Sequence, residues 1–174
     1  MRQTKKLTLS AMMTALGAVF LTLGAFVEVL DLSASVIASL ILVFVYLEIG
    51  SPYTYLVWLS TSLIIFLFFP GSYVWLEYLL VFGIFPVVKG YIERLPKLFW
   101  LLLKLLYANA TLSAMLFLWE KLFGVPFFSK DALYFKIGIY VILNIAFLAY
   151  DMFLTVAVRI YFHKLRHRIK QMLK

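Results

Sequence analysis

The chain has 174 residues and a formal net charge of +8, with 65% apolar residues, only 14% charged residues and a mean hydropathy of +1.01. A soluble domain of this size would have to fill water-facing positions with apolar side chains, so the composition excludes one and predicts an integral membrane protein. The sequence contains no cysteine, which excludes disulfides, thiolate metal sites and thiol nucleophiles.

Six apolar segments follow one another along the chain, each close to the length of about 20 residues that a membrane-spanning helix needs. Acidic or helix-breaking residues separate them: Glu28 with Asp31, Gly50, Pro70-Gly71, Pro96 and Gly124-Val125-Pro126. The expected helices cover residues 7–30, 32–49, 52–69, 72–95, 97–123 and 132–163 of a single membrane domain. Pro86 lies inside the fourth and predicts a bend there. The sequence therefore predicts an all-α, six-transmembrane-helix bundle.

The first of these helices carries a stripe of small residues. Ala11, Ala15 and Ala18 recur at helical spacing, and Thr22 and Ala25 extend the same face. In a bilayer, small residues form contact faces because they let two helices approach closely. The stripe is therefore interpreted either as a packing face within the bundle or as a docking face for a separate protein.

The basic residues predict how the bundle is oriented. Half of the sixteen lie at the chain ends, and Lys89, Arg94 and Lys97 lie near the connection between helices four and five. With six spans these regions share one side, which the positive-inside rule assigns to the cytoplasm, so both termini are expected there. Basic ends that flank membrane spans suit anionic lipid headgroups and do not indicate nucleic-acid binding. The protein is expected in the inner or plasma membrane.

Polar residues inside membrane helices are candidates for function, because burying them there is costly. Lys104 and Asn109 on the fifth helix fall at depths similar to those of Asp151 and Asn144 on the sixth, if the two helices run antiparallel. Lys104 and Asp151 could then form an ion pair, or Lys104 could extend to the headgroups. Lys104 and Asn109 are about 140° apart around their helix, so only one of them is expected to face the sixth helix. Tyr140 shares a face with Asn144.

Two further groups of residues have alternative interpretations. Glu77, between Trp75 and Tyr78, is either an interfacial carboxylate in an aromatic belt or the polar anchor of an outward-facing pocket. Lys89 and Glu93 are spaced for a local salt bridge, or they could contact a partner. His163 and His167 stand among basic residues that would repel a cation, so they are expected to be solvated and no metal site is predicted. No catalytic constellation or phosphate-binding loop is present, which predicts a protein that is not an enzyme and needs no cofactor.

The Lys5-Lys6-Leu-Thr start, the Ala11-Met-Met-Thr-Ala15 motif and six spans with both ends inside resemble the substrate-binding S components of energy-coupling factor (ECF) transporters. The motif covers only about the first twenty residues. The resemblance implies that Ala11, Ala15 and Ala18 dock on a transmembrane T component coupled to two ATPases. It also implies a micronutrient pocket lined mainly by helices four to six and closed by the connection around Glu28 to Ser33. Candidate pocket residues are Trp75, Glu77, Asn109, Tyr140, Asn144 and Asp151.

A non-transporting scaffold of the MreD type is the alternative interpretation. Such a scaffold would use the same small-residue face and basic ends to bind its partners. It predicts a tightly filled core among helices four to six, whereas a carrier predicts an outward cavity on which polar groups converge.

Overall fold

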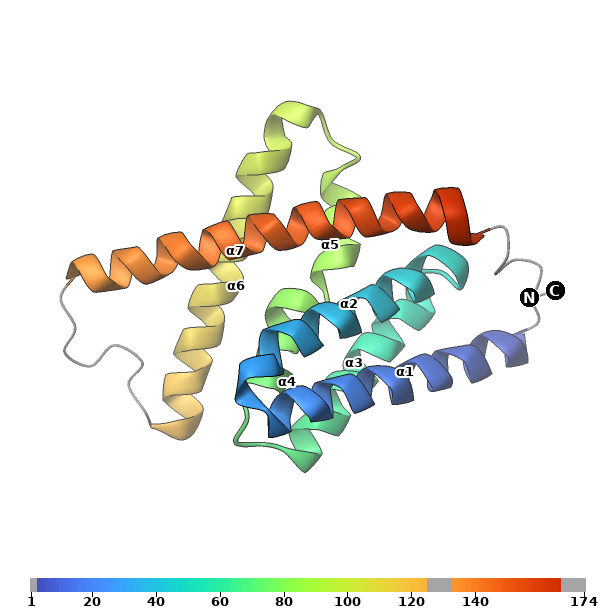
Figure 1. Ribbon diagram of the computed structural model, residues 1–174, viewed down its shortest axis with the longest axis horizontal. Helices are drawn as coiled ribbons and strands as arrows, with labels where there is room; N and C mark the ends of the chain where they lie inside the picture. The colour runs from blue at the N-terminus through green and yellow to red at the C-terminus, as the bar shows by residue number, and fades with distance from the viewer. Residues whose placement is uncertain (1–2, 125–132, 167–174) are drawn as a thin grey trace.

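The computed structural model describes residues 3–124 and 133–166, and within these residues the chain is helical and contains no strand (Figure 1). Six of its helical segments are long and apolar enough to cross a membrane. The fold is thus that of an all-helical, multi-pass membrane protein. The loop expected at residues 127–131, and His167 with the basic residues beyond it, lie outside the described residues.

The helices follow the predicted order. The first three are α1 (Gln3–Phe26), α2 (Asp31–Glu48) and α3 (Ser51–Phe68), with a 3-10 turn over Glu28–Leu30. The fourth span consists of α4 (Val74–Glu77), a π-helical turn (Tyr78–Phe82) and α5 (Phe85–Ile92). The last two are α6 (Trp100–Phe123), after a 3-10 turn over Lys97–Phe99, and α7 (Leu133–Ile160), which continues into a π-helical turn over Tyr161–Leu165.

Glycine and proline set several of these boundaries. Gly50 and Gly124 adopt positive φ angles of 109° and 65°, and each directly precedes or follows a helix. Pro52 lies in the first turn of α3. Backbone N–H groups there have no acceptor within the helix, so the missing N–H of proline costs no hydrogen bond. α1 ends at Phe26, four residues before its expected end, because the 3-10 turn begins at Glu28.

The fourth span is the centre of the bundle: 67% of it is buried, against at most 33% of any other span. It was expected as one bent helix, and the structure instead interrupts it with the π-helical turn. There the Gly83 N–H donates to the Tyr78 carbonyl at 2.7 Å. A Cβ on Gly83 would lie 2.5 Å from that carbonyl oxygen and 2.7 Å from the Trp58 ring, so only glycine fits.

The π-helical turn and Pro86 leave backbone carbonyls without their usual donors, and aromatic side chains from three other helices replace them. Trp58 Nε1 on α3 donates to Leu79 O at 3.1 Å, and the Tyr107 hydroxyl on α6 donates to Leu80 O at 2.8 Å. The Tyr150 hydroxyl on α7 donates to Phe82 O at 3.0 Å. Because a buried unpaired carbonyl is costly in lipid, these bonds hold the interrupted span in place.

α1 packs on α2 and α3 through a face that lies beside the predicted stripe. Its buried residues are Ser10, Gly17, Leu21 and Gly24, whereas Ala11 and Ala15 are exposed and Ala18 is half-buried. Gly24 permits the close approach, since a Cβ there would lie 2.7 Å from that of Ala34 on α2. The packing face of α1 is therefore the glycine face, and the alanine stripe begins outside the bundle.

α7 crosses α6 instead of running antiparallel along it (Figure 1). Beside this crossing, the core among α5, α6 and α7 is filled by aromatic rings of Phe82, Phe85, Tyr107, Phe147 and Tyr150. Phe85, which is completely buried, touches three of the others.

Candidate functional site

Four charged side chains meet between α5, α6 and α7 and form what we call the buried ion network: Lys89, Glu93, Lys104 and Asp151. Lys104 Nζ lies 2.8 Å from Asp151 Oδ2 and 2.9 Å from Glu93 Oε1. Lys89 Nζ bonds the other oxygen of Asp151 and lies 3.2 Å from Glu93 Oε1. Two cations and two anions therefore share one site.

The network is neutral, and Lys89 forms hydrogen bonds beyond its ion pairs. Lys89 Nζ also donates to the Asp151 carbonyl at 2.9 Å and to the Thr155 hydroxyl at 2.7 Å. The side chains of Lys89, Lys104 and Asp151 are 8%, 7% and 13% exposed, whereas the Glu93 side chain is 32% exposed. Paired charges with satisfied hydrogen bonds can be tolerated inside a membrane protein. The arrangement ties three helices together and presents no free cation to a ligand.

Of the two alternatives for Lys104, the structure has the ion pair with Asp151, and of the two for Lys89 and Glu93 it has the local salt bridge. The expectation that only one of Lys104 and Asn109 faces the last helix was wrong, because both side chains bond α7. The long side chain of Lys104 extends around α6, so its ammonium group reaches Glu93 and Asp151 between α5 and α7. The burial of Lys89 was missed, although its place in an apolar run was a signal for it.

Among the described residues, Asn109 and Asn144 form side-chain hydrogen bonds only with α6 and α7. Their amides exchange two hydrogen bonds of 3.0 Å, and each also donates to a carbonyl of its own helix. Tyr140, four residues before Asn144, has its hydroxyl 3.2 Å from that of Ser113. Asn109 pairs with Asn144 and Tyr140 with Ser113, so these three predicted site residues join α6 to α7.

Trp75 and Glu77 lie inside the bundle on α4. Trp75 Nε1 donates to the Pro70 carbonyl at 3.1 Å, and its ring packs edge-on against Phe66. Glu77 is only 7% exposed, and among the described residues its Oε1 has no hydrogen-bond partner. A buried acidic side chain without a cationic partner is unusual in a membrane helix, so Glu77 remains a candidate for a functional role.

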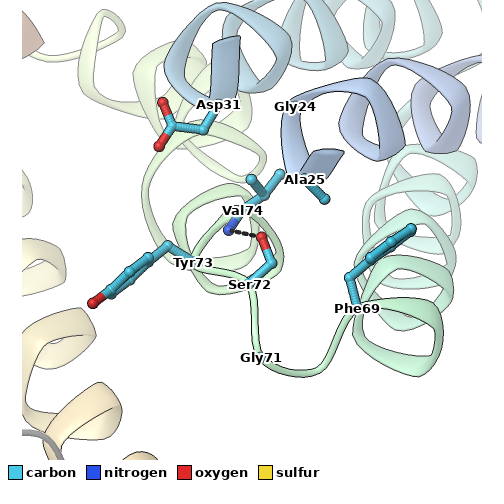
Figure 2. A pocket seen from close by; sticks show the side chains of 8 residues that line it. All are labelled: Gly24, Ala25, Asp31, Phe69, Gly71, Ser72, Tyr73 and Val74. Carbon is cyan, nitrogen blue, oxygen red and sulfur yellow. Dashed lines mark hydrogen bonds between the residues drawn. The ribbon is translucent and has the colours of Figure 1, made fainter. Parts of the chain in front are cut away.

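A cavity of about 590 Å³ opens where the connection between α1 and α2 faces the connection between α3 and α4 (Figure 2). We call it the α1–α4 cavity. Its lining residues are Gly24, Ala25, Asp31, Phe69, Gly71, Ser72, Tyr73 and Val74. None of the six predicted pocket residues is among them. The sequence signal for this cavity was limited to the connection around Glu28 to Ser33, because residues 69–74 form a turn that carries no motif.

Comparisons of the chain with protein-family models, with curated proteins and with solved structures find no match. The class that the fold defines is therefore an all-helical membrane protein with six helices able to span a bilayer. Three features of the structure bear on function: the buried ion network, the exposed alanines of α1 and the α1–α4 cavity.

Proposed function

We propose that this protein is the substrate-binding subunit of an ECF-type importer and carries a small micronutrient in the α1–α4 cavity. In this proposal both termini are cytoplasmic and the cavity opens to the outside of the inner or plasma membrane. The subunit binds its ligand and performs no chemistry. A T component and its ATPases supply the energy, because the sequence has no phosphate-binding loop of its own.

The observation that carries the proposal is the exposure of Ala11 and Ala15. α1 already buries Ser10, Gly17, Leu21 and Gly24 against its own bundle, so the alanines are free to contact another helix. Small residues on a lipid-facing surface let a second membrane helix approach closely. A T component is the partner that the family resemblance implies for this face.

The α1–α4 cavity supports a carrier. A volume of about 590 Å³ lies within the range of roughly 300–1,000 Å³ that is typical of small-molecule sites. Its walls combine a carboxylate, a serine hydroxyl and two aromatic rings (Figure 2). The cavity also lies beside the connection between the first two helices, the segment that closes the pocket in the family resemblance.

Co-purification tests the docking step. The protein is expressed with the T component and ATPases of the same organism, and Ala11→Trp and Ala15→Trp are expected to abolish their recovery with it. Ala110→Trp is the matched control, because Ala110 is an exposed alanine on α6. Unchanged recovery of the module with both α1 variants, at normal thermal stability, would overturn the proposal.

One observation favours a second function, an MreD-type scaffold. The core among α5, α6 and α7, where the carrier hypothesis placed its pocket, is filled by aromatic side chains. A scaffold needs such a core and no ligand. Native mass spectrometry of gently purified protein separates the two functions: a retained small molecule supports the carrier, and a bare protein that retains partner proteins supports the scaffold.

A further inference from the structure

The charge around the α1–α4 cavity is one-sided. Asp31 is the only charged residue among the described residues that line it, and it is half-buried at the first position of α2. Its Oδ1 accepts a hydrogen bond from the N–H of Leu32. Within the described part of the chain, Asp31 forms no ion pair with a lysine or arginine. The wall of the cavity therefore carries an unneutralised negative charge.

The remaining walls suit the body of an organic molecule. The rings of Tyr73 and Phe69 stand on opposite sides of the turn at Gly71, and the carboxylate of Asp31 lies on the same side as Tyr73 (Figure 2). Tyr73 is stacked on Trp119 with ring centroids 3.6 Å apart, and Phe69 packs edge-on against Phe26 at 5.0 Å. These contacts hold the two rings in place. Aromatic faces near a carboxylate favour organic cations through cation–π attraction.

We propose that the α1–α4 cavity selects a small organic cation, whose charged group lies between the Asp31 carboxylate and the ring of Tyr73 on the same side of the cavity (Figure 2). This inference rests on the proposed function, in which the same cavity holds the substrate. It commits to an organic cation instead of a metal ion because no group of three or more metal-binding side chains exists among residues 3–124 and 133–166.

Binding of three probes of similar size and different charge tests the proposal. The protein in nanodiscs of zwitterionic lipid is titrated calorimetrically with benzyltrimethylammonium, benzyl alcohol or benzoate, and empty nanodiscs give the background. Benzyltrimethylammonium is expected to bind saturably and at least tenfold more tightly than the other two. Equal binding of the three probes, preference for benzoate, or no saturable binding of benzyltrimethylammonium would overturn the inference.

Variants tie the selectivity to the cavity. Asp31→Asn is expected to weaken binding of benzyltrimethylammonium at least tenfold, and Asp31→Glu to retain most of it. Glu120→Gln removes the same charge from an exposed carboxylate on α6 outside the cavity and is expected to change nothing. An unchanged affinity in Asp31→Asn contradicts the proposal, and the behaviour of Asp31→Glu excludes a folding defect as the cause of a loss.

The outcomes separate this inference from the function on which it rests. Failure of the cation preference, with normal recovery of the ECF module and a different retained ligand, removes only the substrate class. Failure of the module to co-purify, with cation binding intact, removes the importer and leaves a cation-binding membrane protein.

Discussion

The Tyr150 hydroxyl donates a 3.0 Å hydrogen bond to the carbonyl of Phe82, which lies four residues before Pro86. In an uninterrupted helix, the N–H of residue 86 would bond residue 82, and Pro86 has no N–H to give. A tyrosine on α7 therefore completes the hydrogen bonding of the central span. The fourth span keeps its irregular shape because other helices supply its missing donors.

Removal of this hydroxyl tests the relationship. Tyr150→Phe leaves a buried carbonyl without a donor and is expected to lower the free energy of unfolding by about 1 kcal/mol. Thermal or denaturant unfolding in detergent measures the loss. Tyr140→Phe is the control, since the Tyr140 hydroxyl pairs with Ser113 at an exposed position. An equal loss in both variants would contradict the special role of Tyr150.

Neutralisation of Asp151 tests the buried ion network. Asp151→Asn leaves Lys89 and Lys104 with Glu93 alone, an excess of one buried positive charge. Because removing one partner of a buried pair costs about 3–5 kcal/mol, the variant is expected to unfold at a markedly lower temperature.

Restoring the charge balance should recover part of this stability. In Asp151→Asn combined with Lys104→Met, Lys89 keeps Glu93 at 3.2 Å, and with Lys89→Met instead, Lys104 keeps Glu93 at 2.9 Å. Both double variants are expected to melt above the single variant. Lys121→Met on the exposed surface of α6 removes a cation elsewhere and should give no recovery. Double variants no more stable than Asp151→Asn would show that the charges do not act as one network.

Substitution of Gly24 tests the close packing of α1 against α2 beside the α1–α4 cavity. A Cβ at residue 24 would lie 2.7 Å from that of Ala34 and 3.3 Å from Asp31 Cα, so Gly24→Ala must push the two helices apart. The expected cost is about 1–3 kcal/mol, with weaker binding of any ligand held by Asp31.

Gly71 supplies the matched comparison for this substitution. It lines the same cavity, and a Cβ there meets nothing within 4 Å. Gly71→Ala is therefore expected to leave the melting temperature unchanged. Similar melting temperatures for both alanine variants and the unsubstituted protein would rule out a tight contact at Gly24.

Different features of the fold were predictable to different degrees. Apolar length and breaking residues predict all six spans, because each span has to be apolar on its own to lie in lipid. Helix depth predicts that Lys104 lies level with Asp151 and Asn109 level with Asn144, and both pairs are in contact although α6 and α7 cross, because the contacts lie near the crossing. The sequence does not predict that Lys89 joins the same site. The π-helical turn before Lys89 and the position of α5 depend on contacts with Trp58, Tyr107 and Tyr150.

The stripe on α1 shows the limit of periodicity. The sequence places Ala11, Ala15 and Ala18 on one face, but two small-residue faces lie side by side on this helix and either could pack. In the structure the face of Gly17 and Gly24 packs on α2 and α3, because these helices approach most closely where α1 has no Cβ.

The amino-acid sequence by itself determined the class of protein, the number of helices able to span a membrane and the residues whose polarity makes them costly to bury there. These properties follow from the transfer of each segment into lipid, which depends only on its own composition. The tertiary structure alone decided which polar residues neutralise one another and which do not. Lys89, Lys104, Glu93 and Asp151 cancel their charges between three helices, whereas Glu77 and Asp31 have no such partners among the described residues. That difference arises from how segments distant in the chain are packed.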